Sequence, residues 1–313
     1  MSNWLPLLAT LSIQAMVAMA LLTLPVMAPV AAKDLAVSPA LVGVYVALTY
    51  AGAMFASLSA GTTVSRLGPI RVSQWGLVLC ATGLCLCAVP WLPAIGLGAL
   101  LIGLGYGPIT PASSQILART TPPAQMALVF SIKQTGVPVG AMLAGAIVPS
   151  LMLRIDWQWS LVAVATACVL SALLSQPMRE AMDDLRQANL PFQMGTLTTP
   201  LRMVLGHRAL TTMAACSFMF SMVQMSLTTY LVTYLHDDLA YGMVSAGLLL
   251  SVTQIGGIGG RIAWGVVADR WMGAQKTLAM LASLMAMSAL ATALLLPVLP
   301  IWGIWAILLM FGA

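Results

Sequence analysis

A near-continuous series of long apolar runs is the feature of this sequence that most limits how it can fold. About 20 predominantly apolar residues are enough to cross a bilayer as a helix, and such runs repeat along the chain between short polar breaks. Charged residues make up 7% of the chain, whereas soluble domains carry about 25%. We therefore expect an all-α polytopic membrane protein whose main solvent is lipid.

Nine of these runs are long enough to span a membrane. They cover residues 7–30, 41–63, 72–89, 94–117, 126–150, 157–177, 210–235, 243–267 and 277–297. A tenth run begins near Ile301 and has about 13 residues, or roughly 20 Å of helix, against a hydrocarbon core of ~30 Å. We expect this last helix to be truncated at Ala313.

The basic residues lie mostly on one side of the membrane that these runs predict. Short loops rich in Lys and Arg stay in the cytoplasm, so the richer side marks the cytoplasmic face. The poorer side holds only Lys33 and Arg154. The richer side holds Arg66, Arg71, Arg119, Arg179, Arg186, Arg202, Arg208, Arg270 and Lys276. This asymmetry predicts a cytoplasmic N-terminus in a bacterial-type inner membrane.

Several functional classes are poorly supported by the sequence. The net charge of +5 is spread singly over loops, so no basic patch for nucleic acid is expected. No apolar run contains a His or paired acids, and the sequence has no HExxH motif, which argues against an enzyme and against a metal site. The five cysteines form no CxxC pair and lie inside apolar runs. We expect no cofactor.

The longest polar stretch, residues 178–208, divides the chain into two parts. We predict an N-terminal six-helix bundle over residues 1–178, a cytoplasmic linker over 179–208 and an incomplete C-terminal bundle over 209–313. The linker begins with the segment 177–191, in which Arg179 and Asp183 are spaced i, i+4. This spacing is compatible with a surface helix that ends at Pro191, but a solvated connector is the favoured interpretation.

Two loops on the predicted cytoplasmic side carry similar motifs at corresponding places of the two parts. GTTVSRLGPIR covers residues 61–71 and GVVADRWMGAQK covers residues 265–276. Both resemble the signature G-x-x-x-D-R-x-G-x-(K/R) of the major facilitator superfamily. The first copy has Ser65 in place of the acid, and the second has one extra residue, Met272. The matching positions are Gly61, Arg66, Gly68 and Arg71 in the first copy and Gly265, Asp269, Arg270, Gly273 and Lys276 in the second.

The resemblance implies a fold and a mechanism. It implies two helical bundles built on inverted repeats around a central cavity, here six helices plus an incomplete second half, and secondary transport by alternating access. It also implies that the two loops act as a conformational latch. The carboxylate of Asp269 would then face the start of helix 5 near Thr121, Pro122 and Pro123, where unpaired backbone N–H groups favour an anion.

Two cations inside apolar runs are the strongest candidates for substrate binding. Lys133 and Arg261 lie within predicted spans, and no span contains Asp or Glu. A charge at that depth costs at least about 2.5 kcal/mol unless it is hydrated or paired, so a negatively charged substrate is an economical counter-ion. The alternative is that both side chains snorkel to the cytoplasmic surface.

Glutamines within the spans are the second group of candidates, because an amide facing lipid is unfavourable. Each should face protein or a wet cavity, so hydrogen bonds between helices are the alternative to substrate contacts. The resemblance favours helices 1 and 7 as cavity-lining. The candidates are Gln14, Gln134, Gln224 and Gln254.

The function predicted from these observations is secondary active transport of a small organic solute, with an organic anion as the first hypothesis. A neutral or amphipathic substrate, as in efflux, remains an alternative, since both cations can be structural. A transport-inactive fragment or a sensor of the same fold is a further alternative. The expected partners are the substrate, the lipid bilayer and a coupling proton or ion, for which no intramembrane carboxylate is present.

The charge asymmetry generates a test of orientation. Single cysteines are placed at Asp184 and at Asp238 in a background without the five native cysteines. We expect an impermeant thiol reagent to label position 238 in intact cells and to label position 184 only after permeabilisation. Labelling of position 184 but not 238 in intact cells would contradict the predicted orientation.

Overall fold

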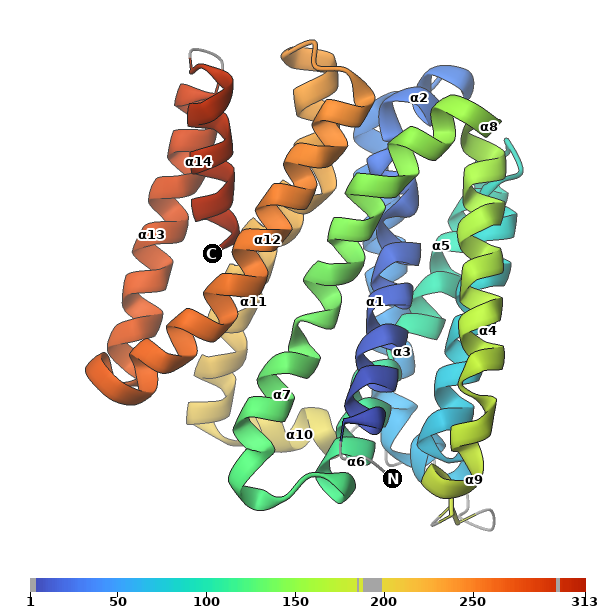
Figure 1. Cartoon of the computed structure of the whole chain (residues 1–313), viewed down its shortest axis with the longest axis vertical. Coiled ribbons are helices and arrows are strands. Elements are labelled where there is room, and N and C mark those ends of the chain that lie inside the picture. Colours follow the sequence, from blue (N-terminus) through green and yellow to red (C-terminus); the bar gives the residue numbers. More distant parts are fainter. Residues whose placement is uncertain (1–3, 185, 188–198, 297–298) are drawn as a thin grey trace.

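The computed structural model describes residues 4–184, 186–187, 199–296 and 299–313, and their regular elements are all helices. Figure 1 shows them as a bundle of long, roughly parallel helices. The first part contains α1 (Leu5–Val26), α2 (Ala28–Asp34), η1 (Pro39–Leu41), α3 (Val42–Leu67), α4 (Pro69–Cys87), α5 (Leu92–Tyr106), α6 (Ile109–Thr120), η2 (Pro123–Gln125), α7 (Met126–Gln134) and α8 (Gly136–Leu174). The remaining elements are η3 (Gln176–Met178), α9 (Arg179–Met182), α10 (Thr199–Gly206), α11 (Arg208–Thr233), η5 (Tyr234–Asp238), α12 (Met243–Val267), η6 (Ala268–Met272), α13 (Ala274–Leu295) and α14 (Ile301–Gly312).

The expectation of an all-α polytopic membrane protein is confirmed. In the described part of the chain, 8 helical segments are long and apolar enough to cross a membrane. One of them, Leu128–Met182, is 55 residues long and contains two of the expected spans. The backbone leaves helical geometry at Ile155 and Asp156, where Asp156 has a φ of 64°. This break reverses the chain at the upper end of Figure 1.

Two other expected spans are broken within the bundle. The run 94–117 becomes α5 and α6, which are separated at Gly107 and Pro108, and the run 126–150 becomes α7 and the first part of α8, separated at Thr135. Lys133 therefore lies in the last turn of a short helix, immediately before a break.

The first and second parts of the chain pack against each other through α8 and α12. A Cβ atom at Gly247 would collide with the carbonyl oxygen of Gly145, so the two backbones touch directly at this point. The Ser251 hydroxyl donates to the carbonyl oxygen of Met142 at 2.8 Å, and the Tyr230 hydroxyl donates to that of Ala40 at 3.2 Å. In Figure 1 the upper parts of α8 and α12 adjoin, whereas the lower end of α12 leads away from α7.

In the described part of the segment 177–191, the chain is helical only as far as Met182, which agrees better with a solvated connector than with a long surface helix. The structure has only the four-residue helix α9, after which Asp183 turns toward the start of α4. The expected i, i+4 ion pair is present, with 3.9 Å between Arg179 Nε and Asp183 Oδ2. Pro191 lies outside the described residues. The Asp183 N–H donates to the carbonyl oxygen of Arg179 in its own turn, while its carboxylate bonds to the start of α4.

The contact between α8 and α12 generates a stability prediction. Gly247→Ala and Gly259→Ala both gain helix propensity, worth about 1 kcal/mol at an interior glycine. A Cβ atom at Gly259 meets open space, whereas one at Gly247 meets the Gly145 backbone. We expect Gly247→Ala to be less stable than Gly259→Ala by about 1–3 kcal/mol because of overpacking.

The measurement is the thermal unfolding midpoint of both variants in the same detergent. Equal midpoints for the two variants would show that α8 and α12 do not touch at Gly145 and Gly247.

Candidate functional site

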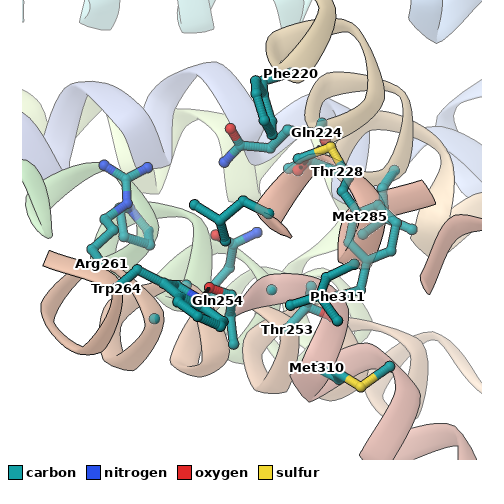
Figure 2. A pocket seen from close by; sticks show the side chains of 18 residues that line it. Phe220, Gln224, Thr228, Thr253, Gln254, Arg261, Trp264, Met285, Met310 and Phe311 are labelled. Atoms are coloured by element: carbon teal, nitrogen blue, oxygen red, sulfur yellow. Dashed lines mark hydrogen bonds between the residues drawn. The ribbon is translucent and has the colours of Figure 1, made fainter. Parts of the chain in front are cut away.

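A cavity of about 340 Å³ lies among α11, α12, α13 and α14, with Pro138 of α8 at its edge. The elements that form it come from distant parts of the second half, and Gly257 and Gly260 of α12 allow the end of α14 to pack closely against α12 at one wall. Figure 2 shows the side chains that surround it, with Gln224 from α11 and Gln254 and Arg261 from α12. Three of the predicted substrate-binding residues are thus brought together in one place.

Arg261 supplies the positive charge of this cavity. Its side chain is exposed, and Nη1 donates to the carbonyl oxygen of Gln134 at 3.0 Å, which links α12 to the end of α7. Within the described residues Arg261 forms no ion pair. A guanidinium has five N–H donors in a planar fork that fits carboxylates and phosphates. Most of these donors are free to bind an anion that enters the cavity.

The other walls combine amides with aromatic rings. Gln254 is buried and Gln224 is half-buried, and each brings donors and an acceptor. Phe220, Trp264 and Phe311 supply apolar surface (Figure 2). An apolar cavity with a few convergent polar groups and one cation is the usual form of a site for a small organic ligand.

Lys133 occupies a separate buried cluster at the junction of α1, α6 and α7. Its side chain is 1% exposed, and its Nζ donates to the carbonyl oxygen of Thr110 at 3.3 Å and to Ser114 Oγ at 3.4 Å. Thr110 Oγ1 in turn donates to Gln14 Oε1 at 3.4 Å. Gly136 lies against the Gln14 side chain, where a larger residue would collide with it. The predicted residues Lys133 and Gln14 therefore share one cluster.

This cluster is incompletely satisfied. The Nε2 atom of Gln14 is buried and has no hydrogen-bond partner among the described residues. Both bonds of Lys133 are long, since N–H···O bonds are normally 2.7–3.2 Å. The alternative of a snorkelling Lys133 is wrong in this structure, because its Nζ bonds within the protein and its side chain is buried.

The predicted site residues therefore fall into two groups. Arg261, Gln224 and Gln254 surround the cavity, whereas Lys133 and Gln14 lie in the buried cluster. Gln134 joins the groups through its main-chain carbonyl, while its side chain is exposed. No finding tests whether any of them binds substrate.

Sequence reasoning missed two groups of residues near these sites. Thr110 and Ser114 lie four residues apart on α6 and hold the Lys133 amine. The sequence did carry a signal for them, because two hydroxyl residues at i, i+4 inside an apolar run indicate a polar stripe on one face of the helix. Phe220, Trp264 and Phe311 gave no such signal, because single aromatic residues in membrane helices face lipid as readily as a cavity.

The two loop motifs share a backbone feature. Gly68 has a φ of 91° and Gly273 a φ of 74°, and each directly precedes a helix, α4 and α13 respectively. Residues with a side chain rarely adopt this conformation, which explains a glycine at both positions. The side chain of Asp269 lies outside the described residues, so its expected contact with the start of helix 5 remains a prediction.

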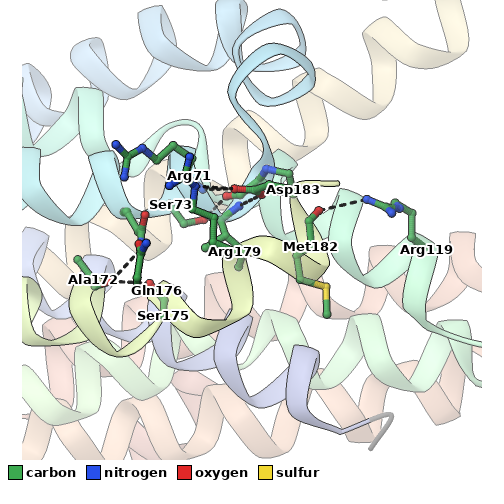
Figure 3. Close-up of polar contacts among 12 residues, drawn as sticks. Arg71, Ser73, Arg119, Ala172, Ser175, Gln176, Arg179, Met182 and Asp183 are labelled. Carbon is green, nitrogen blue, oxygen red and sulfur yellow. Dashed lines mark hydrogen bonds and ion pairs between the residues drawn. The ribbon is translucent and has the colours of Figure 1, made fainter. Parts of the chain in front are cut away.

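Asp183 supplies a carboxylate beside the first motif copy, where Ser65 has replaced the acid. Its Oδ1 and Oδ2 accept the backbone N–H groups of Ile70 and Arg71 at 2.8 and 3.1 Å, at the start of α4 (Figure 3). These N–H groups have no partner within the helix, and the helix dipole favours an anion there. Burial raises the pKa of the Asp183 carboxyl, while these two hydrogen bonds and Arg179 act in the opposite direction.

The residues around Asp183 are also held by Arg119 and by the backbone of Ser65. Arg119 Nη2 forms an ion pair with Asp184 Oδ1 at 2.8 Å, and Arg119 Nη1 donates to the carbonyl oxygen of Met182 at 3.2 Å. The backbone N–H of Gln187 donates to the carbonyl oxygen of Ser65 at 2.9 Å. The start of the predicted linker is therefore fixed to the first half of the protein.

Comparisons with known proteins agree on one family. The model of the Major Facilitator Superfamily matches residues 8–313. A putative metabolite transport protein of Haemophilus influenzae is 27% identical over 80% of this chain and 63% of its own length. The hexuronate transporter of Bacillus subtilis is 24% identical over 71% of this chain and 56% of its own length. The chain thus spans less than two thirds of the length of these relatives.

A solved structure has the same fold. It is a bacterial homologue of the human lysosomal transporter Spinster in an inward-facing and occupied conformation. It matches with a TM-score of 0.66 at 17% identity over 98% of this chain and 71% of that chain. At this identity the likeness concerns the fold alone.

Asp183 generates a stability prediction. Asp183→Ala removes both acceptors at the start of α4, and loss of such a cap costs about 0.5–2 kcal/mol. Glu180→Ala is the control, because Glu180 is an exposed acid one turn earlier. We expect a lower thermal unfolding midpoint for Asp183→Ala than for Glu180→Ala. The cap would be of no consequence if the two midpoints coincided.

Proposed function

Because the chain belongs to the Major Facilitator Superfamily, we propose that it is a secondary active transporter that moves a small organic anion across the inner membrane by alternating access. The cavity around Arg261 is the proposed binding site. Arg261 provides the charge, Gln224 and Gln254 orient the substrate through hydrogen bonds, and the aromatic residues contact its apolar part.

Arg261 has no acidic partner among the described residues, and this observation carries the proposal. A guanidinium that only stabilises the fold usually meets a carboxylate, but the bond from Arg261 is to a neutral carbonyl oxygen. An anion in the cavity would supply charge-assisted hydrogen bonds, which are about twice as strong as neutral ones. A neutral solute would form only the weaker, neutral hydrogen bonds with this guanidinium.

The names of the relatives support an acidic metabolite. The hexuronate transporter of Bacillus subtilis carries by name a sugar with a carboxylate group. A hexuronate combines the two chemical features that the cavity can bind, namely one negative charge for Arg261 and several hydroxyls for the glutamines. We therefore take glucuronate as the first substrate to test.

The arrangement of the two halves favours an inward-facing state. The halves touch near Gly145 and Gly247, and α12 leads away from α7 at the end where the N-terminus lies (Figure 1). With the N-terminus in the cytoplasm, the end at which α12 leads away from α7 lies on the inner side of the membrane. In the proposed cycle the two loop motifs hold the cytoplasmic ends together in the opposite state, with Asp269 near the start of helix 5.

A neutral or amphipathic substrate is the second candidate. The contact between Arg261 and the Gln134 carbonyl favours it, since this bond gives Arg261 a structural role that links α12 to α7. The aromatic side chains of the cavity would then be the main binding surface.

A comparison of two sugars tests the proposal. Glucuronate and glucose differ mainly in the carboxylate, so proteoliposomes should take up glucuronate and exclude glucose. Arg261→Gln removes one charge-assisted contact worth about 1.5–3 kcal/mol, which predicts a loss of roughly 10- to 150-fold in uptake at subsaturating glucuronate.

Arg154→Gln is the matched control, because Arg154 is an exposed arginine outside the cavity. It should leave uptake unchanged. Equal uptake of the two sugars, or equal glucuronate uptake by the wild type and Arg261→Gln, would favour the second candidate.

A further inference from the structure

The Lys133 amine has an environment that suits a neutral base better than a permanent cation. Its side chain is 1% exposed, and it forms no ion pair with any described residue. Its two partners are a carbonyl oxygen and a hydroxyl at 3.3 and 3.4 Å, which leaves an ammonium with one unused donor and two weak bonds. Burial of an ammonium under these conditions is unfavourable.

The cluster also has more donors than acceptors. The Gln14 amide already has one buried N–H group without an acceptor, and a charged Lys133 adds three more donors. A neutral amine needs fewer acceptors and gains a lone pair. The Ser114 hydroxyl can then donate to the amine, while the amine still donates to the Thr110 carbonyl, so both observed contacts also fit the neutral form.

Few charged groups surround this amine. Helix α7 packs against α1, η2, α6 and α8. Helix α1 and η2 contain no titratable residue, and Arg119 of α6 is engaged with Asp184 and Met182. The titratable residues of α8, which are Arg154, Asp156 and Cys168, come at least 21 positions after Lys133 in the sequence. The remaining neighbour is Arg261, which bonds to the carbonyl of Gln134, the residue next to Lys133.

We infer that Lys133 carries a coupling proton, which it binds when an anion occupies the site at Arg261. In the empty protein, burial without a counter-charge opposes protonation of this amine. An anion bound at Arg261, which contacts the residue next to Lys133, attracts the ammonium and so favours protonation. In this step the neutral amine takes up one proton and becomes an ammonium, while one anion binds at Arg261. The new N–H bond is the only change in covalent bonds.

This inference rests on the proposed function and adds a mechanism for its energy source. A monovalent anion and one proton cross together, so the cycle moves no net charge and is driven by the pH gradient. The proton reaches Lys133 past Thr110 and Gln134, both of which are exposed and flank the buried amine. A transporter of this kind needs no carboxylate in its membrane helices.

Proton uptake on binding is the direct test. Glucuronate is titrated into the purified protein by calorimetry at several pH values, in buffers with different ionisation enthalpies. At pH values at which the Lys133 amine is neutral in the empty protein, we expect uptake of up to about one proton per bound glucuronate. In that range the dissociation constant should rise by up to about tenfold per pH unit. Binding without proton uptake at every pH would overturn the inference and leave the proposed function intact.

Substitutions assign the proton to Lys133. Lys133→Arg has a permanent charge, so glucuronate should bind without proton uptake and with an affinity that does not depend on pH. Lys133→Met has no charge, so binding should be weak at every pH, again without proton uptake. Lys33→Met is the control, since Lys33 is an exposed lysine at the end of α2, and it should behave as the wild type.

The outcomes separate the two proposals. Proton uptake that persists in both Lys133 variants would overturn the assignment to this residue. If the wild type binds no glucuronate, or binds it as well as Arg261→Gln does, the proposed function fails and the coupling fails with it. If Lys133→Arg does not fold, the wild type, Lys133→Met and Lys33→Met still decide the question.

Discussion

The absence of hydrogen-bond partners in hydrocarbon is the constraint on which this structure depends. Each peptide group inside the membrane must find its partner within the protein, which makes a helix the default for every spanning segment. Breaks in the helices are tolerated where protein surrounds them. The break at Thr135 is such a place, and it allows Lys133 to turn into a polar cluster between α1 and α6. The irregular backbone and the buried amine are therefore parts of one arrangement.

Much of the fold was predictable because, in a membrane, the length of an apolar run is enough to identify a spanning helix. Runs of apolar residues mark spans regardless of how the helices pack, so the expected spans reappear as helices with modest shifts at their ends. The turn at Ile155 and Asp156 falls between the expected spans 126–150 and 157–177, whereas the interruptions at Gly107, Pro108 and Thr135 fall inside runs that were expected to be single spans. The linker helix, the less favoured interpretation, rested on the spacing of Arg179 and Asp183 alone. That pair is present, but Asp183 also binds α4, and a contact between residues 113 positions apart leaves no periodic signal.

The candidate site was predictable only in part. Charged and amide residues inside apolar runs were visible in the sequence, and Arg261, Gln224 and Gln254 do share a cavity. Their separation from Lys133 and Gln14 was not visible, because it depends on which face of each helix meets which neighbour. The hydroxyls of Thr110 and Ser114 matter only through their distance to the Lys133 amine, and a sequence carries no such distance.

The contact of Gly145 with Gly247 has a mechanical consequence for the proposed cycle. The two backbones touch at Gly145 and Gly247, with Pro149 and Ser251 packed beside the contact, so rotation of one half against the other would pivot at this narrow point. From Gly145 to the start of α7 is 19 residues, a lever arm of nearly 30 Å at 1.5 Å per residue. With that arm, a rotation of about 10° displaces the far end by about 5 Å, close to one helical turn. Small angular changes at this point are thus enough to open or close the far ends of the two halves.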